Sequence, residues 1–162
     1  MAGDRNGADR LSWGSPPWPL DRRAYSIRLR AHYPSTKEAL NEAVTCLLGV
    51  AERSGCITDE KADLEIALRE AVANAIIHGN ALGNEKNIFV RCYAAPQIGL
   101  LIVVRDQGPG FNPVELPDPR DSDRKELHHG RGVFLMRELM DFVEYRKGGC
   151  EVILFKACRP GS

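Results

Sequence analysis

Three polar residues, Glu70, Asn74 and His78, recur at four-residue intervals in the run EAVANAIIHGN. On a helix that turns about 100° per residue, this spacing predicts a single polar stripe. Apolar residues border the stripe on both sides, which predicts that the helix is largely buried. The residues are Leu64, Leu68, Ala71, Val72 and Ala75 on one side, and Ile66, Ala73 and Ile77 on the other.

A carboxylate inside such a helix needs a partner, because burying an unpaired charge is costly. A bound ion, an ordered water or a ligand hydroxyl would satisfy Glu70. An ordinary solvent-facing stripe is the alternative, and this stretch alone does not decide between the two.

A second candidate site follows the apolar run LLIVVRD, where Asp106 begins the pattern D-x-G-x-G-F. Gly108 and Gly110 permit close approach of a ligand to the backbone, with Phe111 directly after them. The Asp106 carboxylate can accept hydrogen bonds from a donor such as an exocyclic amine. Taken alone, the pattern also marks plain turns.

A second glycine pair, Gly130 and Gly132, stands at the expected start of a helix that continues through Arg131, Val133 and Phe134. Free backbone N–H groups at a helix N-terminus form a phosphate site that the helix dipole favours. No Gly-Lys-Ser/Thr follows, which excludes a P-loop, and no strand–G-x-G-x-x-G–helix unit supports a Rossmann fold.

The elements that must position these residues follow from periodicity and from turn residues. Ser35 or Thr36 is expected to cap the first helix and Gly55 to end it, and Thr58 is expected to cap the second. Residues 107–129 contain four prolines without periodicity, which indicates a long functional loop or lid. The expected order is strand 24–31, helix 36–54, helix 59–78, strands 87–94 and 99–106, helix 131–140, and strands 142–147 and 151–157. This order predicts an α+β fold with helices on one face of the sheet. In the first strand Tyr25, Ile27 and Leu29 alternate with polar residues, which predicts that they share one half-buried face.

The totals fit one ordinary globular domain. Lysine plus arginine and aspartate plus glutamate number 22 each, so charge gives no reason to expect nucleic acid or a membrane surface as a partner. The five cysteines match no metal-binding spacing, which predicts free thiols, a reducing compartment and hence the cytoplasm. Residues 1–23 are polar and aperiodic apart from Trp13 and Trp18, which predicts a flexible tail without a secretory signal. Whether the two tryptophans dock on a partner or on the domain, or are incidental, stays open.

Together and in this order, the three segments resemble the ATP-binding fold shared by gyrase, Hsp90, histidine kinases and MutL, the GHKL or Bergerat fold. They are most similar to bacterial anti-sigma factor serine kinases, through EAVANAIIHGN, VVRDQGPGF and GRGVFLMRELMDFVEY. The resemblance implies a two-layer α/β sandwich with a mixed, mostly antiparallel sheet. It places a histidine-kinase-like ATPase domain at 24–158 and an ATP lid at about 112–129. Short tails at 1–23 and 159–162 remain.

The resemblance also implies roles for individual residues. Glu70 is expected to be the catalytic general base, Asn74 to hold Mg²⁺ and Asp106 to bind the adenine amine. The remaining expected nucleotide contacts are His78, Gly108, Gly110, Phe111, Gly130, Arg131, Gly132, Val133 and Phe134.

One departure from the family is the histidine pair His128–His129, which stands where relatives often carry an arginine that reaches the terminal phosphate. Arg124, Lys125 and Arg131 are candidates to replace that arginine.

The resulting hypothesis is an ATP- and magnesium-dependent protein serine kinase that binds a sigma factor and phosphorylates an anti-sigma factor antagonist. A homodimer is implied by the family alone. Because the lid arginine is missing, a non-catalytic regulator gated by ATP or ADP stays open as the alternative. A histidine kinase module is disfavoured, since no helical hairpin with a phospho-accepting histidine precedes the domain.

Overall fold

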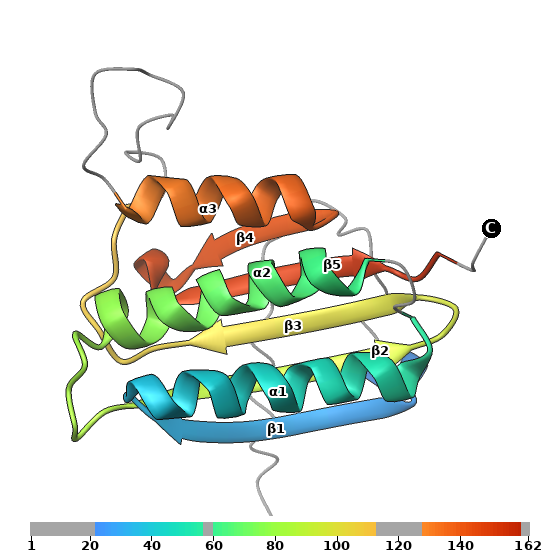
Figure 1. Cartoon of the computed structure of the whole chain (residues 1–162), viewed down its shortest axis with the longest axis horizontal. Helices are drawn as coiled ribbons and strands as arrows, with labels where there is room; N and C mark the ends of the chain where they lie inside the picture. The colour runs from blue at the N-terminus through green and yellow to red at the C-terminus, as the bar shows by residue number, and fades with distance from the viewer. Residues whose placement is uncertain (1–21, 57–59, 113–127, 160–162) are drawn as a thin grey trace, which may run out of the picture.

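A computed structural model describes residues 22–56, 60–112 and 128–159 of the chain (Figure 1). Most of the predicted N-terminal tail, lid and C-terminal tail, and the predicted cap Thr58, therefore lie outside the described residues. The elements are η1 (Arg22–Ala24), β1 (Ile27–Pro34), α1 (Lys37–Ser54), α2 (Lys61–Ala73), η2 (Asn74–Gly79), β2 (Asn87–Ala95), β3 (Gly99–Arg105), α3 (His128–Leu139), β4 (Phe142–Arg146), η3 (Lys147–Gly149) and β5 (Glu151–Ala157).

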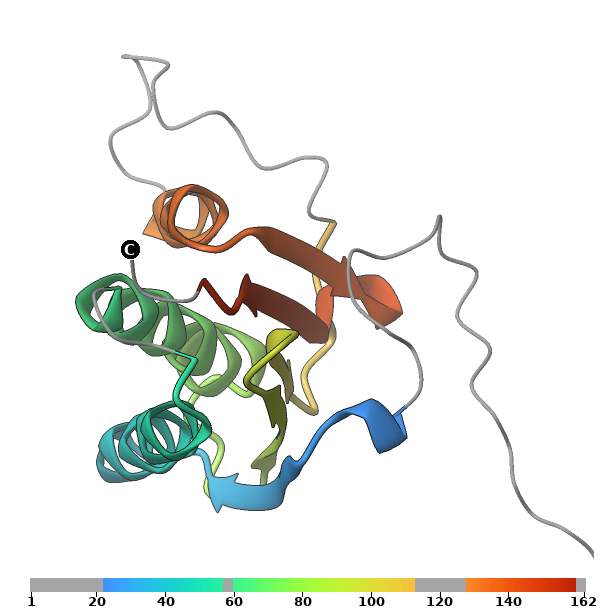
Figure 2. The same ribbon diagram turned by 90° about the vertical axis from the view of Figure 1, so that its right-hand side faces the viewer.

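The five strands form one sheet in the order β1-β2-β3-β5-β4. All four described pairings are antiparallel, so the predicted mostly antiparallel sheet contains no parallel pair among these strands. The three α-helices lie together on one face, which gives two layers (Figure 2). The predicted α+β class and the placement of the helices are confirmed.

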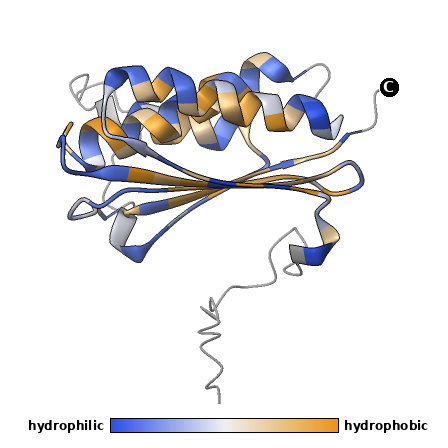
Figure 3. Ribbon diagram, turned by 90° about the horizontal axis from the view of Figure 1, so that it is seen from below, coloured by the Kyte–Doolittle hydropathy of each residue, from blue (hydrophilic) through white to orange (hydrophobic). Residues whose placement is uncertain are grey.

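The main core lies between the helices and this face of the sheet, where apolar residues gather (Figure 3). Strand alternation turns every second side chain toward the helices. The most deeply buried members of the core include Leu47, Leu64, Leu68, Ile76, Ile88, Leu100, Ile102, Met136 and Leu154.

Helix α1 begins and ends as its sequence predicts. Thr36 is the N-cap, and its hydroxyl accepts a hydrogen bond from the Ala39 N–H at 3.2 Å. Gly55 ends the helix in the left-handed region at φ 67°. Of the two predicted cap residues, Thr36 takes the role, and Ser35 instead accepts a hydrogen bond from the Asn80 side chain.

The first strand begins later than predicted, at Ile27 rather than Ala24. Ile27 and Leu29 pack against the main core. Tyr25, predicted to share their face, packs instead with Tyr93, whose ring centroid is 6.0 Å away in a separate cluster. The expectation for Tyr25 was wrong, because the residue precedes the strand and does not obey its alternation.

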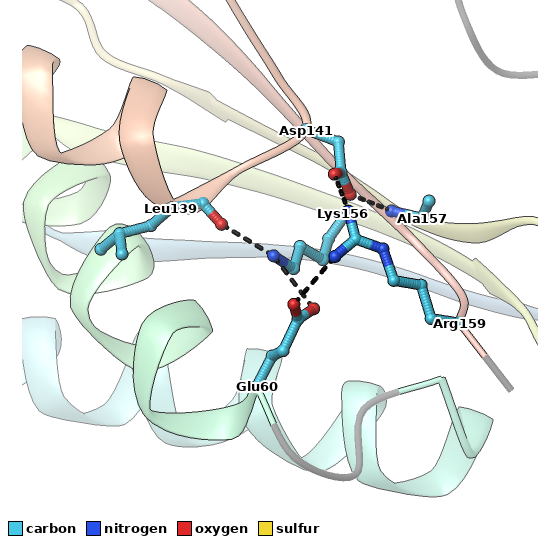
Figure 4. A network of polar contacts seen from close by, with 6 residues as sticks. All are labelled: Glu60, Leu139, Asp141, Lys156, Ala157 and Arg159. Atoms are coloured by element: carbon cyan, nitrogen blue, oxygen red, sulfur yellow. Dashed lines mark hydrogen bonds and ion pairs between the residues drawn. The ribbon is translucent and has the colours of Figure 1, made fainter. Parts of the chain in front are cut away.

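A polar network joins the ends of three elements around the buried Lys156 (Figure 4). The Lys156 ammonium lies 3.0 Å from a Glu60 carboxylate oxygen. It also donates a hydrogen bond of 2.9 Å to the carbonyl oxygen of Leu139, which is the last residue of α3. Arg159 pairs with both Glu60 and Asp141. Arg159 was predicted to belong to the C-terminal tail, yet these pairs tie it to the domain.

Replacing Lys156 by Met should lower the free energy of unfolding by about 1–2 kcal/mol, because the α3 carbonyl loses a charged donor. The loss stays below that of a fully buried pair, since Glu60 is partly solvated and keeps Arg159 as a partner. Urea denaturation monitored by circular dichroism measures it. Lys61→Met, which removes only the exposed Lys61–Glu52 pair, is the matched control and should change little. Equal midpoints for both variants would contradict the role of Lys156.

Candidate functional site

The helix that carries Glu70 changes geometry in the middle of the predicted stripe. Helix α2 ends at Ala73, and the chain continues as the π-helix Asn74–Gly79. The wider π turn departs from the 100° spacing and is frequent at functional sites. Asn74 and His78 line a cavity, whereas Glu70 lies against Gly132 of α3.

The two flanks of the stripe differ in burial. Leu64, Leu68 and Val72 are fully buried, but Ile66 is 43% exposed and Ile77 is 38% exposed. The expectation that the helix is buried on both flanks was therefore wrong. Only one flank faces the sheet, and the hydrophobic pattern cannot tell which.

Asp106 follows the end of β3 and is buried against the end of the π-helix. A Cβ on Gly79 would lie 2.3 Å from the Asp106 carboxyl carbon, so only glycine allows the carboxylate this position. The Gly108 N–H donates to Asp106 Oδ1 at 2.7 Å. Burial raises the pKa of Asp106 above its usual range, although the Gly108 N–H and the charges of Lys86 and Arg105 act against the rise.

The cavity beside Asp106 holds about 150 Å³. A largely apolar cavity of that size takes up a flat aromatic ring. Phe111 and Tyr145 stand edge to face on its wall, with ring centroids 5.0 Å apart at 70°. The other lining residues are Ala71, Asn74, Ala75, His78, Gly79, Val104, Asp106, Gly110, Val133, Gly149, Cys150 and Val152.

The N-terminal half of α3 lies against Glu70 at Gly132, the fifth residue of the helix. A Cβ on Gly132 would lie 2.5 Å from Glu70 Oε2 and 3.5 Å from the Asn74 amide nitrogen. Glu70, Asn74 and the backbone of the α3 N-terminus therefore meet at one point. This point adjoins the cavity, because Asn74 and Val133 line it. The free backbone N–H groups of the first residues of α3 are suited to phosphate oxygens.

The structure thus brings Asn74, His78, Asp106, Gly110, Phe111 and Val133 to one cavity and sets Glu70 and Gly132 beside it. Gly108 packs close to the Gly79 carbonyl, while Gly130 is buried, Arg131 is exposed and Phe134 is half-buried outside the lining. His128 and His129 begin α3, but their side chains are outside the description, as are Arg124 and Lys125.

Tyr145 is a site residue that the sequence reasoning missed. Its hydroxyl is buried in the cavity wall beside the Asn74 side chain, and no described group hydrogen-bonds it with good geometry. Burial raises the pKa of Tyr145 to about 12, so the phenol stays neutral. The sequence offers one signal for Tyr145: the alternation of β4 places its side chain on the face of the sheet that the helices cover.

The site offers ligands for a hard cation. Magnesium prefers oxygen ligands and keeps phosphate and water oxygens, so it needs few groups from the protein. The Asn74 amide can supply one such oxygen. Among the described residues, no cluster of three or more His, Cys, Asp or Glu side chains could hold a metal by itself.

The cysteines fit the expected free thiols, since all five are unpaired; Cys56 and Cys92 are buried. Within the described ranges, no helix is both long and apolar enough to cross a bilayer.

Comparison with known proteins identifies a matching family and a set of relatives. A family model described as the histidine kinase-like ATPase domain matches residues 33–156. The serine-protein kinase RsbW of Staphylococcus epidermidis is 29% identical over 130 residues, covering 76% of this chain and 82% of the relative. Serine-protein kinase RsbW of Staphylococcus aureus strain Newman is similar to the same extent.

Proposed function

Because the chain belongs to the histidine kinase-like ATPase domain family, we propose that it is an ATP-dependent protein serine kinase acting as an anti-sigma factor. Its substrate is a serine of an anti-sigma factor antagonist, and its second partner is a sigma factor. The family match and the serine-protein kinases among the relatives support the resemblance inferred from the motifs and imply ATP binding. The finer assignments of partner and substrate are part of the proposal.

The observation that carries the proposal is the meeting of Glu70, Asn74 and the α3 N-terminus beside an apolar cavity. Phosphoryl transfer needs mainly positioning, charge neutralisation and a base near the attacking hydroxyl. Bound magnesium–ATP would supply the phosphoryl group and the neutralising charge. Every other requirement falls to side chains and backbone of this chain.

Each group then has a definite task. Glu70 takes the proton of the substrate serine hydroxyl. As it does so, the serine oxygen bonds to the terminal phosphorus of ATP, and the bond from that phosphorus to the oxygen that leaves with ADP breaks. Asn74 would hold the metal through its amide oxygen, and the free N–H groups at the N-terminus of α3 would hold phosphate oxygens. Asp106 accepts from the adenine amine while Phe111 and Tyr145 pack against the base.

The site residues not assigned above keep supporting parts in the proposal. His78, Gly110 and Val133 border the base, and Gly130 and Arg131 form the turn that precedes the phosphates. The proposal further includes a homodimer and a cytoplasmic location, with no direct nucleic acid or membrane partner.

The test is transfer of labelled phosphate from ATP to candidate antagonist proteins in the presence of magnesium. We expect label on a serine of one antagonist, identified by mass spectrometry, together with ATP uptake by calorimetry. Nucleotide uptake without any labelled partner would overturn the kinase assignment and leave the binding site intact.

A non-catalytic regulator gated by ATP or ADP is the second candidate, favoured by His128–His129 where relatives often carry a phosphate-binding arginine. It predicts an unlabelled partner whose affinity for this chain differs between the two nucleotides. Label on a histidine of a separate protein would instead indicate a histidine kinase module.

A further inference from the structure

Asn80 directly follows the π-helix and is a buried polar residue with no part in the proposed chemistry. Only 1% of its surface is exposed. Its own N–H donates to the Ala75 carbonyl at 2.8 Å, which fixes Asn80 to the end of the π-helix that carries Asn74 and His78. Because a buried side-chain amide is costly unless it is hydrogen-bonded, its partners show what it holds in place.

The Asn80 amide joins three segments that are far apart along the chain. Its nitrogen donates to Ser35 Oγ at 2.7 Å and to the Asn87 carbonyl at 2.9 Å. Its oxygen accepts the backbone N–H of Gln107 at 2.7 Å. The Asn87 carbonyl can only accept and the Gln107 N–H can only donate, so these two partners fix the direction in which the amide points. Both hydrogens and the oxygen of the amide are thus used inside the protein.

The Gln107 N–H belongs to the turn that presents Asp106. Three consecutive N–H groups set the path of this turn. The Asp106 N–H donates to the Cys150 carbonyl at 2.9 Å, and the Gly108 N–H donates to Asp106 Oδ1 at 2.7 Å. The middle group, on Gln107, is held by the Asn80 side chain. Rotation of the peptide between Asp106 and Gln107 therefore breaks the bond to Asn80.

We infer that Asn80 is a positioning residue for adenine recognition, whose amide oxygen holds the turn so that the Asp106 carboxylate meets the adenine amine. The inference rests on the proposed function, which gives Asp106 that contact. A side chain that binds a ligand selectively must be held within about 0.5 Å by its supporting groups. Asp106 is also packed against Gly79, the residue before Asn80, so one short segment of the chain sets both the carboxylate and its turn.

The contact with the amine is measured by comparing ATP with inosine triphosphate (ITP), which carries an oxygen in place of the adenine amine. The unaltered chain should bind ATP about 10- to 100-fold more tightly than ITP, since ITP cannot donate to the charged carboxylate. In Asn80→Ala this preference should fall most of the way to equality, while the affinity for ITP stays nearly unchanged. Calorimetry with each nucleotide in the presence of magnesium gives both affinities.

Two further variants separate positioning from stability alone. Ser35→Ala removes the 2.7 Å bond on the other side of the same amide, and Ser35 is as buried as Asn80. It should lower the urea midpoint and keep the preference for ATP. Asn80→Asp keeps an oxygen for the Gln107 N–H, and burial keeps the new carboxyl group neutral, so the preference should again be kept. Loss of the preference in either variant would make Asn80 a structural residue only.

The outcomes distinguish this inference from the proposed function. A preference for ATP that survives Asn80→Ala, with nucleotide uptake intact, would overturn the inference and leave the proposed function standing. Equal or absent uptake of ATP and ITP by the unaltered chain would instead overturn the Asp106 contact on which the inference rests.

If Asn80→Ala fails to fold, amide hydrogen exchange in the unaltered chain decides. At saturation, ATP should slow exchange of the Gln107 N–H several-fold more than ITP does, because a filled contact at Asp106 holds the turn and its bond to Asn80 closed. An equal effect of the two nucleotides on this N–H would overturn the inference.

Discussion

Replacing Glu70 by Gln should lower the rate of phosphoryl transfer about 10²- to 10⁴-fold, the contribution of a positioned general base. The two side chains have the same shape, so the replacement fits against Gly132, where Glu70 Oε2 already leaves no room for a Cβ. An amide cannot take up the proton of the attacking hydroxyl. Affinity for ATP should stay nearly unchanged, because the phosphates and the base bind to other groups. Single-turnover transfer and calorimetry measure the two effects separately.

The matched control is Glu65→Gln on the same helix, where Glu65 forms only an exposed pair with Arg69, 3.0 Å away. This change should leave transfer within experimental error of the unaltered chain. Undiminished transfer in Glu70→Gln would remove Glu70 from the chemistry. Loss of ATP binding along with activity would make it a binding residue instead of a base.

Short-range signals predicted much of the fold that surrounds this carboxylate. Thr36 and Gly55 mark the ends of α1 because capping depends on residues within one turn. Strands β2 to β5 were also predicted to within about two residues of their observed limits, as their alternating runs are bounded by turn residues. The order of the three motifs led to the family, which the match over residues 33–156 confirms.

Features that depend on long-range packing escaped the sequence. Tyr25 precedes β1, and a shift of a strand start by a few residues changes which face a side chain occupies. The exposure of Ile66 and Ile77 depends on where α2 meets the sheet. Tyr145 joins the cavity only because β4 pairs at the edge of β5, close to Asn74. None of these facts has a local signature.

The second large effect is expected at Asp106, where Asp106→Asn should weaken ATP binding about 10- to 100-fold. Asp106 Oδ1 already accepts the Gly108 N–H, so the asparagine oxygen would keep that place. Its NH₂ group would then face the adenine amine, and two donors would meet where a charged acceptor had been. A hydrogen bond to a charged group contributes about 1.5–3 kcal/mol, which sets the size of the loss. GTP, with an acceptor oxygen at that position of its base, should lose less, and competition calorimetry measures the ratio.

The same carboxyl group should make nucleotide affinity depend on pH. Burial raises the folded-state pKa of Asp106, so the group takes up its proton at a higher pH than an exposed aspartate does. Affinity for ATP should therefore be constant above that pKa and fall as pH drops through it, because a protonated carboxyl no longer offers a charged acceptor. In Asp106→Asn this dependence should vanish. Without bound nucleotide, Asp106→Asn should be at least as stable as the unaltered chain at neutral pH. A raised pKa means that the buried negative charge of Asp106 opposes folding there. A pH profile of affinity that is identical in both proteins would show that Asp106 does not contact the base.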